Sequence, residues 1–303
     1  MNDKPVRESV SQVGHSQGTA GTAPTRDGRE LFFMRLPGPS GADVPTVVFE
    51  GGLAASRSYW APVQSAVAAW APAVVYDRSG LGRSAPDPGP RPLTRLAADL
   101  GELLDHLGPG PFVLAGHSWG GPIVRLAAAA RPGRIAGLVL VDPSEESCDL
   151  VFEPAMRRAE KIGQTVSAAL ARAGLLGLAY RGLLAALPDD ARRDMRAEGF
   201  TVDAIRTRAA ELASVVPDLT AMREHPPELP DVPVTVISGA LTAPGMGRKV
   251  RDAANASHEF RATRSAKGKH VLARKSGHMV PVTEPGLIAA EIRALLAPSG
   301  GAA

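Results

Sequence analysis

Ser118 stands in the run GHSWGG, residues 116–121, with a glycine two residues away on either side. A buried-strand pattern, residues 112–115, precedes the run, and a helix-like stretch, residues 123–130, follows it. A sharp turn from strand to helix strains the residue at its tip, and side chains two residues away would clash, so glycine is needed there. Such a turn exposes Oγ at a helix N-terminus, where the dipole favours developing negative charge. The pattern therefore predicts that Ser118 is a nucleophile.

A histidine is the expected general base, because a serine hydroxyl is a weak nucleophile at neutral pH. The chain has seven histidines. His278 lies in a loop between the last strand pattern and the last helix pattern, from which it can reach the carboxyl edge of a sheet. We therefore favour His278 as the base. His270, which opens the strand pattern of residues 270–273, is the alternative.

The base needs a carboxylate that fixes its tautomer and stabilises the imidazolium. Asp142 follows the apolar run LVLV, at the tip of the strand expected after the nucleophile helix. The stretch after the next strand, residues 238–243, contains no carboxylate. Asp142 is therefore the favoured acid, and Glu145, Glu146 and Asp252 remain alternatives.

Two hydrogen-bond donors are needed for the oxyanion of a tetrahedral intermediate. The backbone N–H of Trp119, directly after the serine, is one candidate. The second is expected from the loop EGGL, residues 50–53, because glycines let the backbone approach a substrate closely. Within that loop Gly52 is the first candidate and Leu53 the next.

Short apolar runs end in the polar or glycine-rich stretches that carry these residues. The runs are residues 46–49, 73–76, 112–115, 138–141 and 234–237. They are continuous rather than alternating, which is typical of strands buried on both faces of a parallel sheet. Helical spacing of apolar residues lies between them, as in residues 93–107. Strands that alternate with helices predict an α/β fold with a doubly wound, mostly parallel sheet.

The alternation stops in a stretch of helix-like sequence, residues 147–228, which is rich in Ala, Leu and Arg. We expect a helical cap there, inserted into a core of residues 25–146 and 229–303. Such an insert would lie over the carboxyl edge of the sheet, where open α/β sheets bind ligands. Residues 1–24 are rich in Ser, Gly, Thr and Gln, and are expected to form a disordered N-terminal arm.

The composition excludes several classes of protein. The 303 residues are 44% hydrophobic and 21% charged, with a net charge of +3, as in ordinary globular proteins. Basic residues are interspersed with acidic ones and aromatics are 4%, so we expect no nucleic-acid partner. The single cysteine, Cys148, excludes an intrachain disulfide and a cysteine-based metal site. No secretory signal or membrane-spanning run is evident, so we expect a cytoplasmic protein without a membrane partner.

Together these motifs resemble the α/β-hydrolase superfamily of serine hydrolases. The matching pieces are VFEGG at 48–52 with Trp60 downstream, YDRSGLGRS at 76–84, GHSWGG at 116–121, LVLVDP at 138–143 and SGH at 276–278. The likeness covers about residues 26–146 and 229–297. It implies an eight-stranded sheet, a helical cap, a nucleophile elbow at Ser118, and acyl-enzyme chemistry that needs no cofactor and no metal. The polar turn of residues 77–84 is read as scaffold, held by Asp77 and Arg78.

Two departures from the family pattern stand out. The usual His-Gly of the oxyanion loop is Glu50-Gly51 here, and the usual acid after the later strand is missing. Some members carry the acid after the earlier strand, where Asp142 stands. The serine nucleophile argues against the epoxide hydrolase and haloalkane dehalogenase branches, which use an aspartate.

The leading hypothesis is a serine hydrolase that cleaves a carboxylic ester, a thioester or a lactone through an acyl-enzyme on Ser118. The leucine-rich cap favours a small-molecule substrate with an apolar acyl or alcohol group. The same triad also suits C–C bond hydrolysis, acyl transfer or perhydrolysis. A non-catalytic ligand-binding protein is a further alternative, since a fold does not determine a function. The substrate and the oligomeric state are left open.

Overall fold

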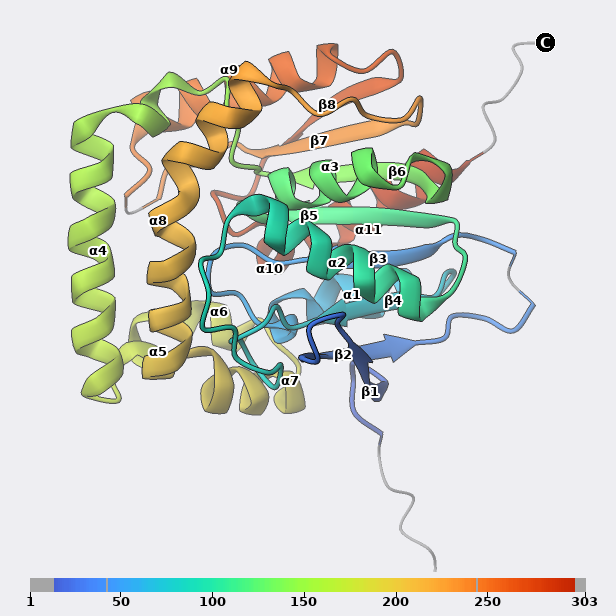
Figure 1. Ribbon diagram of the computed structural model, residues 1–303, viewed down its shortest axis with the longest axis horizontal. Helices are drawn as coiled ribbons and strands as arrows, with labels where there is room; N and C mark the ends of the chain where they lie inside the picture. Colours follow the sequence, from blue (N-terminus) through green and yellow to red (C-terminus); the bar gives the residue numbers. More distant parts are fainter. Residues whose placement is uncertain (1–13, 42, 244, 298–303) are drawn as a thin grey trace, which may run out of the picture.

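Eight strands form one sheet with helices on both faces in the computed structural model, which describes residues 14–41, 43–243 and 245–297 (Figure 1). The strands are β1 (Thr19–Pro24), β2 (Glu30–Leu36), β3 (Thr46–Glu50), β4 (Ala73–Tyr76), β5 (Phe112–His117), β6 (Ile135–Val141), β7 (Val234–Gly239) and β8 (Gly268–Ala273). Their order is β1-β2-β4-β3-β5-β6-β7-β8. Only the pairs β1–β2 and β2–β4 are antiparallel within this sheet of the described chain. The predicted class, a doubly wound and mostly parallel sheet, is confirmed.

Two apolar layers, one on each face, bury the sheet. Successive side chains of a strand point to opposite faces, and in β3 Val48 enters one layer while Val47 and Phe49 enter the other. The first layer packs beneath α2 (Leu93–Leu107), α3 (Gly120–Ala130) and α9 (Arg248–Thr263); the second packs beneath α1 (Ala61–Ala68) and α11 (Pro285–Leu296). Burial on both faces explains why the central strands read as continuous apolar runs.

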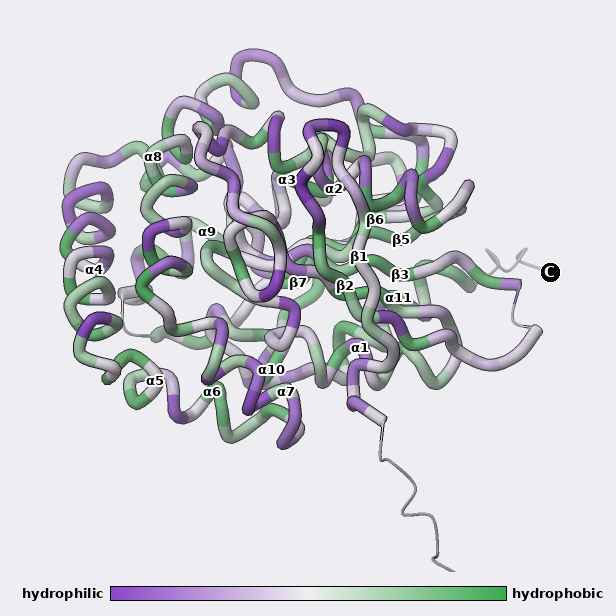
Figure 2. The backbone as a smooth tube through the Cα atoms, turned by 60° about the horizontal axis from the view of Figure 1, so that its bottom comes forward, coloured by the Kyte–Doolittle hydropathy of each residue, from purple (hydrophilic) through white to green (hydrophobic). Residues whose placement is uncertain are grey.

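Between β6 and β7 the chain is helical, and we call residues 149–224 the helical insert. Its elements are η3 (Asp149–Phe152), α4 (Pro154–Arg172), α5 (Leu176–Ala179), α6 (Arg181–Ala185), α7 (Asp189–Asp194), η4 (Met195–Gly199) and α8 (Val202–Glu224). The long helices α4 and α8 pack side by side beyond one end of the sheet (Figure 1). In Figure 2 hydrophobic and hydrophilic residues alternate along α4, as a helix with one packed face requires. The division of the chain into domains remains a prediction.

The predicted disordered arm, residues 1–24, is wrong in its last part, while residues 1–13 lie outside the described residues. β1 pairs with β2 along its whole length, and Ala23 is fully buried. A Cβ at Gly21 would lie 2.5 Å from the Phe33 ring, so the missing side chain makes room for that ring. The segment has no apolar alternation of its own, because pairing with β2 rather than local periodicity holds it in place.

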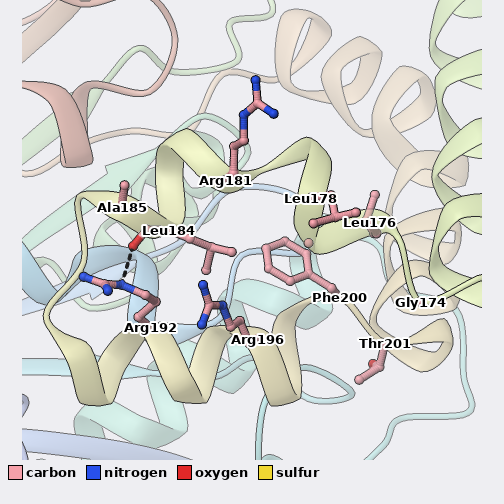
Figure 3. Close-up of a pocket in the computed structure, with 11 residues that line it drawn as sticks. Gly174, Leu176, Leu178, Arg181, Leu184, Ala185, Arg192, Arg196, Phe200 and Thr201 are labelled. Carbon is pink, nitrogen blue, oxygen red and sulfur yellow. Dashed lines mark hydrogen bonds between the residues drawn. The ribbon is translucent and has the colours of Figure 1, made fainter.

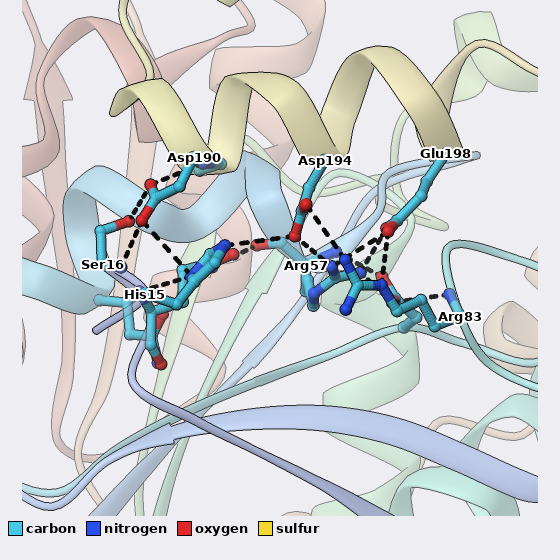
Figure 4. A network of polar contacts seen from close by, with 11 residues as sticks. His15, Ser16, Arg57, Arg83, Asp190, Asp194 and Glu198 are labelled. Atoms are coloured by element: carbon cyan, nitrogen blue, oxygen red, sulfur yellow. Dashed lines mark hydrogen bonds and ion pairs between the residues drawn. The ribbon is translucent and has the colours of Figure 1, made fainter. Parts of the chain in front are cut away.

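The buried guanidinium of Arg57 joins the helical insert to the core. It binds Asp77 of the core at 2.6 Å, and Asp194 and Glu198 of the insert at 2.5 and 2.6 Å (Figure 4). Arg83, from the turn after β4, binds the same two insert carboxylates at 3.1 and 2.6 Å. Because Arg57 is fully buried, these carboxylates compensate a charge that water does not reach.

The carboxylates of the insert recur every four residues along α7 and η4, which places them on one face. Asp190 accepts hydrogen bonds from the backbone N–H and the Oγ of Ser16, each at 2.6 Å. Asp194 lies 3.3 Å from Nε2 of His15, and Glu198 completes the series (Figure 4). The insert is therefore tied both to the core and to the segment that leads into β1.

Candidate active site

Ser118 occupies the strained tip of the turn between β5 and α3. Its φ is 54°, in the left-handed region that a residue with a side chain rarely adopts. A Cβ at Gly116 would lie 2.4 Å from the carbonyl oxygen of Gly120, and one at Gly120 would lie 2.5 Å from that of Glu50. The Ser118 N–H donates to the carbonyl of Val141 at 3.0 Å. The backbone around the turn thus has no space for side chains at the two glycines.

The structure brings together the three residues favoured for the triad. Nε2 of His278 lies 3.1 Å from Oγ of Ser118, and Nδ1 of His278 lies 2.7 Å from Oδ2 of Asp142. Ser118 follows β5, Asp142 follows β6, and His278 lies in the loop between β8 and α10 (Val280–Thr283). All three positions are at the carboxyl edge of the parallel strands, where the sheet brings distant segments together.

Asp142 is buried and held by an arginine that sequence reasoning missed. Arg251, on α9, donates to both carboxylate oxygens of Asp142, at 2.5 and 3.0 Å, and the Gly239 N–H donates at 2.9 Å. Burial raises the pKa of Asp142, but the hydrogen bond to His278 and the Arg251 guanidinium outweigh it and hold the pKa well below its usual range. Asp142 is therefore ionised at neutral pH, as an orienting acid must be.

The alternative acids lie elsewhere. Glu146 binds Arg125 through both oxygens at 2.7 Å, and Glu145 accepts from Arg261 at 2.8 Å. These four side chains form a buried charge cluster beside α9, and neither glutamate hydrogen-bonds to His278 within the described chain. Asp252 lies on the exposed side of α9.

A second polar chain lies behind Asp142. Ser238 Oγ lies 2.7 Å from Nδ1 of His258 and 2.8 Å from Nε2 of His270. Nε2 of His258 lies 2.8 Å from the carbonyl oxygen of Pro143, to which only an N–H can donate, so the neutral ring accepts from Ser238 at Nδ1. His270, the alternative base, is thus bound to Ser238 and is not brought to Ser118. His258 had no sequence signal, because its role depends on three segments that meet only in the fold.

Burial in this region has a consequence for stability at acid pH. Burial lowers the pKa of His258 to about 4 and that of His117 to about 3, whereas an unfolded histidine titrates near pH 6.5. Below about pH 6.5 the unfolded chain therefore binds more protons than the folded chain. The free energy of unfolding then decreases as the pH is lowered, until the pH reaches the pKa of the folded state. For His258 alone we expect a loss of roughly 2–3 kcal/mol between pH 7.5 and 4.5.

Urea unfolding at several pH values measures this effect. The free energy of unfolding of the His258→Asn protein should depend less on pH than that of the wild type. His225→Asn, at an exposed position, is the matched control and should follow the wild type. If the three curves were parallel, His258 would not be a source of the acid sensitivity.

The loop expected to supply the oxyanion donor lies against Ser118. A Cβ at Gly52 would lie 3.1 Å from Cβ and 3.5 Å from Oγ of Ser118, so a side chain there would press against Ser118. Leu53 lines the same cavity as Ser118, and Trp119 is fully buried directly after it. The Arg78 guanidinium donates to the carbonyls of Gly52 and the preceding residue at 2.6 and 2.7 Å. A buried cation thus fixes the backbone of this loop.

Arg78 also explains the glutamate at position 50. It binds Glu50 at 2.5 Å and Glu211 of α8 at 2.9 Å, while Glu50 accepts a hydrogen bond from the Tyr76 hydroxyl. All these groups are buried, so the guanidinium needs carboxylate partners there. Asp77 and Arg78 both make buried ion pairs, and Arg78 reaches beyond its own turn to the loop of residues 50–53 and to the helical insert.

A cavity of about 260 Å³ lies between this edge of the sheet and the helical insert. Ser118, His278 and Gly52 line its core side. Its walls are largely apolar and include Tyr59, Leu176, Leu183, Phe200, Ile205 and Met279. The volume lies just below the 300–1,000 Å³ usual for drug-sized ligands. The site thus suits a small substrate.

Two structural searches bear on other functions. Among the residues that the structure describes, no group of three or more His, Cys, Asp or Glu side chains is arranged to hold a metal ion. In the same part of the chain, no helix has the length and apolar character needed to cross a membrane.

Comparisons with known proteins agree with this geometry. The family model for the alpha/beta hydrolase fold matches residues 45–233. RutD of Azorhizobium caulinodans, provisionally named a carbamate hydrolase, is 36% identical over 102 residues, which are 34% of this chain and 38% of RutD. The match thus spans less than half the length of that curated relative.

Two solved structures cover nearly the whole chain. An esterase from Thermogutta terrifontis has a TM-score of 0.66 at 20% identity, over 92% of this chain and 98% of its own. The epoxide hydrolase CorEH has a TM-score of 0.71 at 18% identity, over 92% of this chain and 99% of its own. At such identities the likeness concerns the fold.

Proposed function

The chain belongs to the α/β-hydrolase family, and on that premise we propose that it is a serine hydrolase that cleaves a carboxylic ester, a thioester or a lactone. One observation carries the proposal: the His278 ring lies 3.1 Å from Oγ of Ser118 on one side and 2.7 Å from Asp142 on the other. This is the hydrogen-bonded chain that makes a serine hydroxyl nucleophilic at neutral pH.

The proposed reaction has two halves that use the same residues. Oγ of Ser118 attacks the carbonyl carbon while Nε2 of His278 takes its proton, and Asp142 stabilises the imidazolium. The N–H groups of Gly52 or Leu53 and of Trp119 bind the oxyanion. His278 then protonates the leaving oxygen or sulfur, and an acyl group remains on Ser118. Water, activated by His278, releases the acid and restores the serine.

The serine at position 118 and the name of a relative guide the choice of substrates to test. CorEH shares the fold, but the serine at position 118 favours attack on a carbonyl rather than on an epoxide. RutD is named for carbamate hydrolysis, and a carbamate is attacked at the same kind of carbon. Carbamates therefore belong in the substrate panel beside esters, thioesters and lactones.

The length of the substrate's acyl chain is expected to control the rate of hydrolysis. A cavity of about 260 Å³ has room for about nine water-sized groups. Hydrolysis of p-nitrophenyl acetate and butyrate should therefore exceed that of the octanoate and dodecanoate by roughly tenfold or more in kcat/KM, because one methylene misplaced in an apolar pocket costs about 1–3 kcal/mol. The measurement is the release of p-nitrophenol by the wild type.

A fluorophosphonate probe, which labels activated serines, separates the alternatives. Labelling of the wild type but not of Ser118→Ala, together with ester turnover, is the expected result. An optimum at twelve carbons would contradict the cavity argument. Absence of both turnover and labelling would contradict the hydrolase proposal and favour a ligand-binding protein on this fold.

A further inference from the structure

We propose that the substrate carries a carboxylate, which Arg208 binds on the side of the catalytic cavity that the helical insert lines. This inference rests on the proposed function and specifies the substrate class for the same site. Most residues that line the cavity are apolar or glycine, and the polar side chains among them are those of Ser118, His278, His117, Ser167, Arg208, Tyr59 and Tyr180. Arg208 is the one arginine, lysine or carboxylate side chain among the described residues that line this cavity, and burial lowers the pKa of His117, which also lines it, to about 3, so that this ring is neutral.

Arg208 is held in place by a neighbouring amide. It lies in the first half of α8 and donates a hydrogen bond to Oε1 of Gln164 on α4. The Gln164 amide nitrogen donates to the carbonyl of Ile205 at 2.8 Å, which turns the amide oxygen toward the arginine. Among the described residues, this hydrogen bond uses one of the five guanidinium N–H donors. The remaining donors are available to a ligand.

The charge of Arg208 is not matched by an ion pair. Other arginines of the interior, such as Arg78 and Arg251, each bind carboxylates. No carboxylate of the described chain lies within 4.0 Å of the Arg208 guanidinium, as the ion pairs of the structure show. Glu160 is near enough for Arg208 to lower its pKa, against the larger effect of burial, but both Glu160 oxygens bind Arg157, at 2.7 and 2.8 Å.

A neighbouring cavity extends the positive charge. It has a volume of about 510 Å³ and shares Leu176 and Phe200 with the catalytic cavity. Arg192 and Arg196 line it from one helical segment (Figure 3). Arg192 pairs with Asp189, whereas Arg196 has no ion pair within the part of the chain that is described. A cleft lined by one sign of charge raises the local concentration of oppositely charged ligands.

The chemistry of Ser118 and of Arg208 then defines the class of substrate. A guanidinium in a cavity with apolar walls binds an anion more strongly than in water, and its planar fork fits a carboxylate with two parallel hydrogen bonds. The carbonyl to be cleaved lies at Ser118 and the carboxylate at Arg208, with the apolar walls around the carbons between them. This arrangement fits a half-ester, a thioester or a lactone that bears a free carboxylate.

Matched pairs of esters test this inference. The first pair is 4-nitrophenyl hemiglutarate and 4-nitrophenyl valerate, which differ in a terminal carboxylate on the acyl side. The second pair is 4-carboxyphenyl and 4-carbamoylphenyl butyrate, which place the charge on the alcohol side. In at least one pair the wild type should prefer the anionic ester by tenfold or more in kcat/KM, since a hydrogen bond to a charged group has an effect of that size.

The variants assign the preference to one side chain. Arg208→Gln should remove the preference through a higher KM for the anionic ester and leave the neutral ester within about twofold. Arg206→Gln, on the same helix but exposed and paired only with Asp203, is the control and should keep the preference. High salt should reduce the preference in the wild type.

The outcomes distinguish the two proposals. If the wild type hydrolyses neutral esters but prefers neither anionic partner, the inference about Arg208 is wrong and the hydrolase remains. If Arg208→Gln slows both members of a pair equally, Arg208 has only a structural role. If no ester is hydrolysed and Ser118 is not labelled by a fluorophosphonate, the proposed function itself fails. The comparison of anionic with neutral esters by the wild type tests the carboxylate preference even where a variant does not fold.

Discussion

Ser118→Ala is expected to lower kcat by a factor of 10⁴ or more while the protein remains folded. Removal of the nucleophile of a serine triad can lower kcat by up to about 10⁶, because the other residues of the triad cannot act without it. The free energy of unfolding should change by no more than about 1 kcal/mol, since only the hydrogen bond to His278 is lost. The measurements are hydrolysis of p-nitrophenyl butyrate and unfolding in urea.

A glycine at the same position adds an independent check on the backbone. The φ of 54° at Ser118 is strained for any residue with a Cβ, so Ser118→Gly should be more stable than Ser118→Ala, by about 1 kcal/mol, although equally inactive. Ser265→Ala, far from the site in a surface turn, is the control and should keep full activity. Substantial activity in Ser118→Ala would remove the basis for an acyl-enzyme.

Asp142→Asn is expected to reduce kcat by about 10⁴, because an asparagine stabilises the wrong tautomer of the histidine and cannot balance the imidazolium. It should also lower the free energy of unfolding by about 3–5 kcal/mol, since Arg251 keeps its charge but loses its buried carboxylate partner. The two effects are separated by expressing kcat per folded enzyme, with the folded fraction measured by near-UV circular dichroism.

Glu146→Gln is the matched control for that variant. It too leaves buried guanidinium groups, those of Arg125 and Arg261, with less negative charge, so stability should fall. Its kcat per folded enzyme should stay close to that of the wild type, because Glu146 does not contact His278. The reverse pattern, an active Asp142→Asn and an inactive Glu146→Gln, would transfer the role of the acid to Glu146.

Local sequence patterns predicted the fold and the candidate residues near Ser118. The runs that became β3 to β7 are apolar because each strand is covered on both faces, and that cause acts on adjacent residues. The glycines around Ser118 are likewise required by a turn of a few residues. Such constraints leave a signal in a short window of sequence.

Residues that depend on distant partners left no such signal. Arg251 and Arg208 are ordinary basic residues on helices, and only the fold brings them to Asp142 and to the catalytic cavity. β1 was missed for the same reason, because its partner β2 and not its own composition keeps it extended. Glu50 was noticed as a departure from a family pattern, but its partner Arg78 lies on a neighbouring strand end and could not be inferred from the loop alone.

The order of residues along the chain has a consequence for how the enzyme matures during synthesis. Ser118 and Asp142 leave the ribosome before the helical insert, whereas Arg251 and His278 follow it. The interval between Asp142 and His278 corresponds to on the order of 10 s of translation. Asp142 lacks its arginine until residue 251 is made, and Ser118 lacks the histidine proposed as its base throughout the interval. Under the proposed mechanism the growing polypeptide is therefore catalytically silent until β7, α9 and β8 dock.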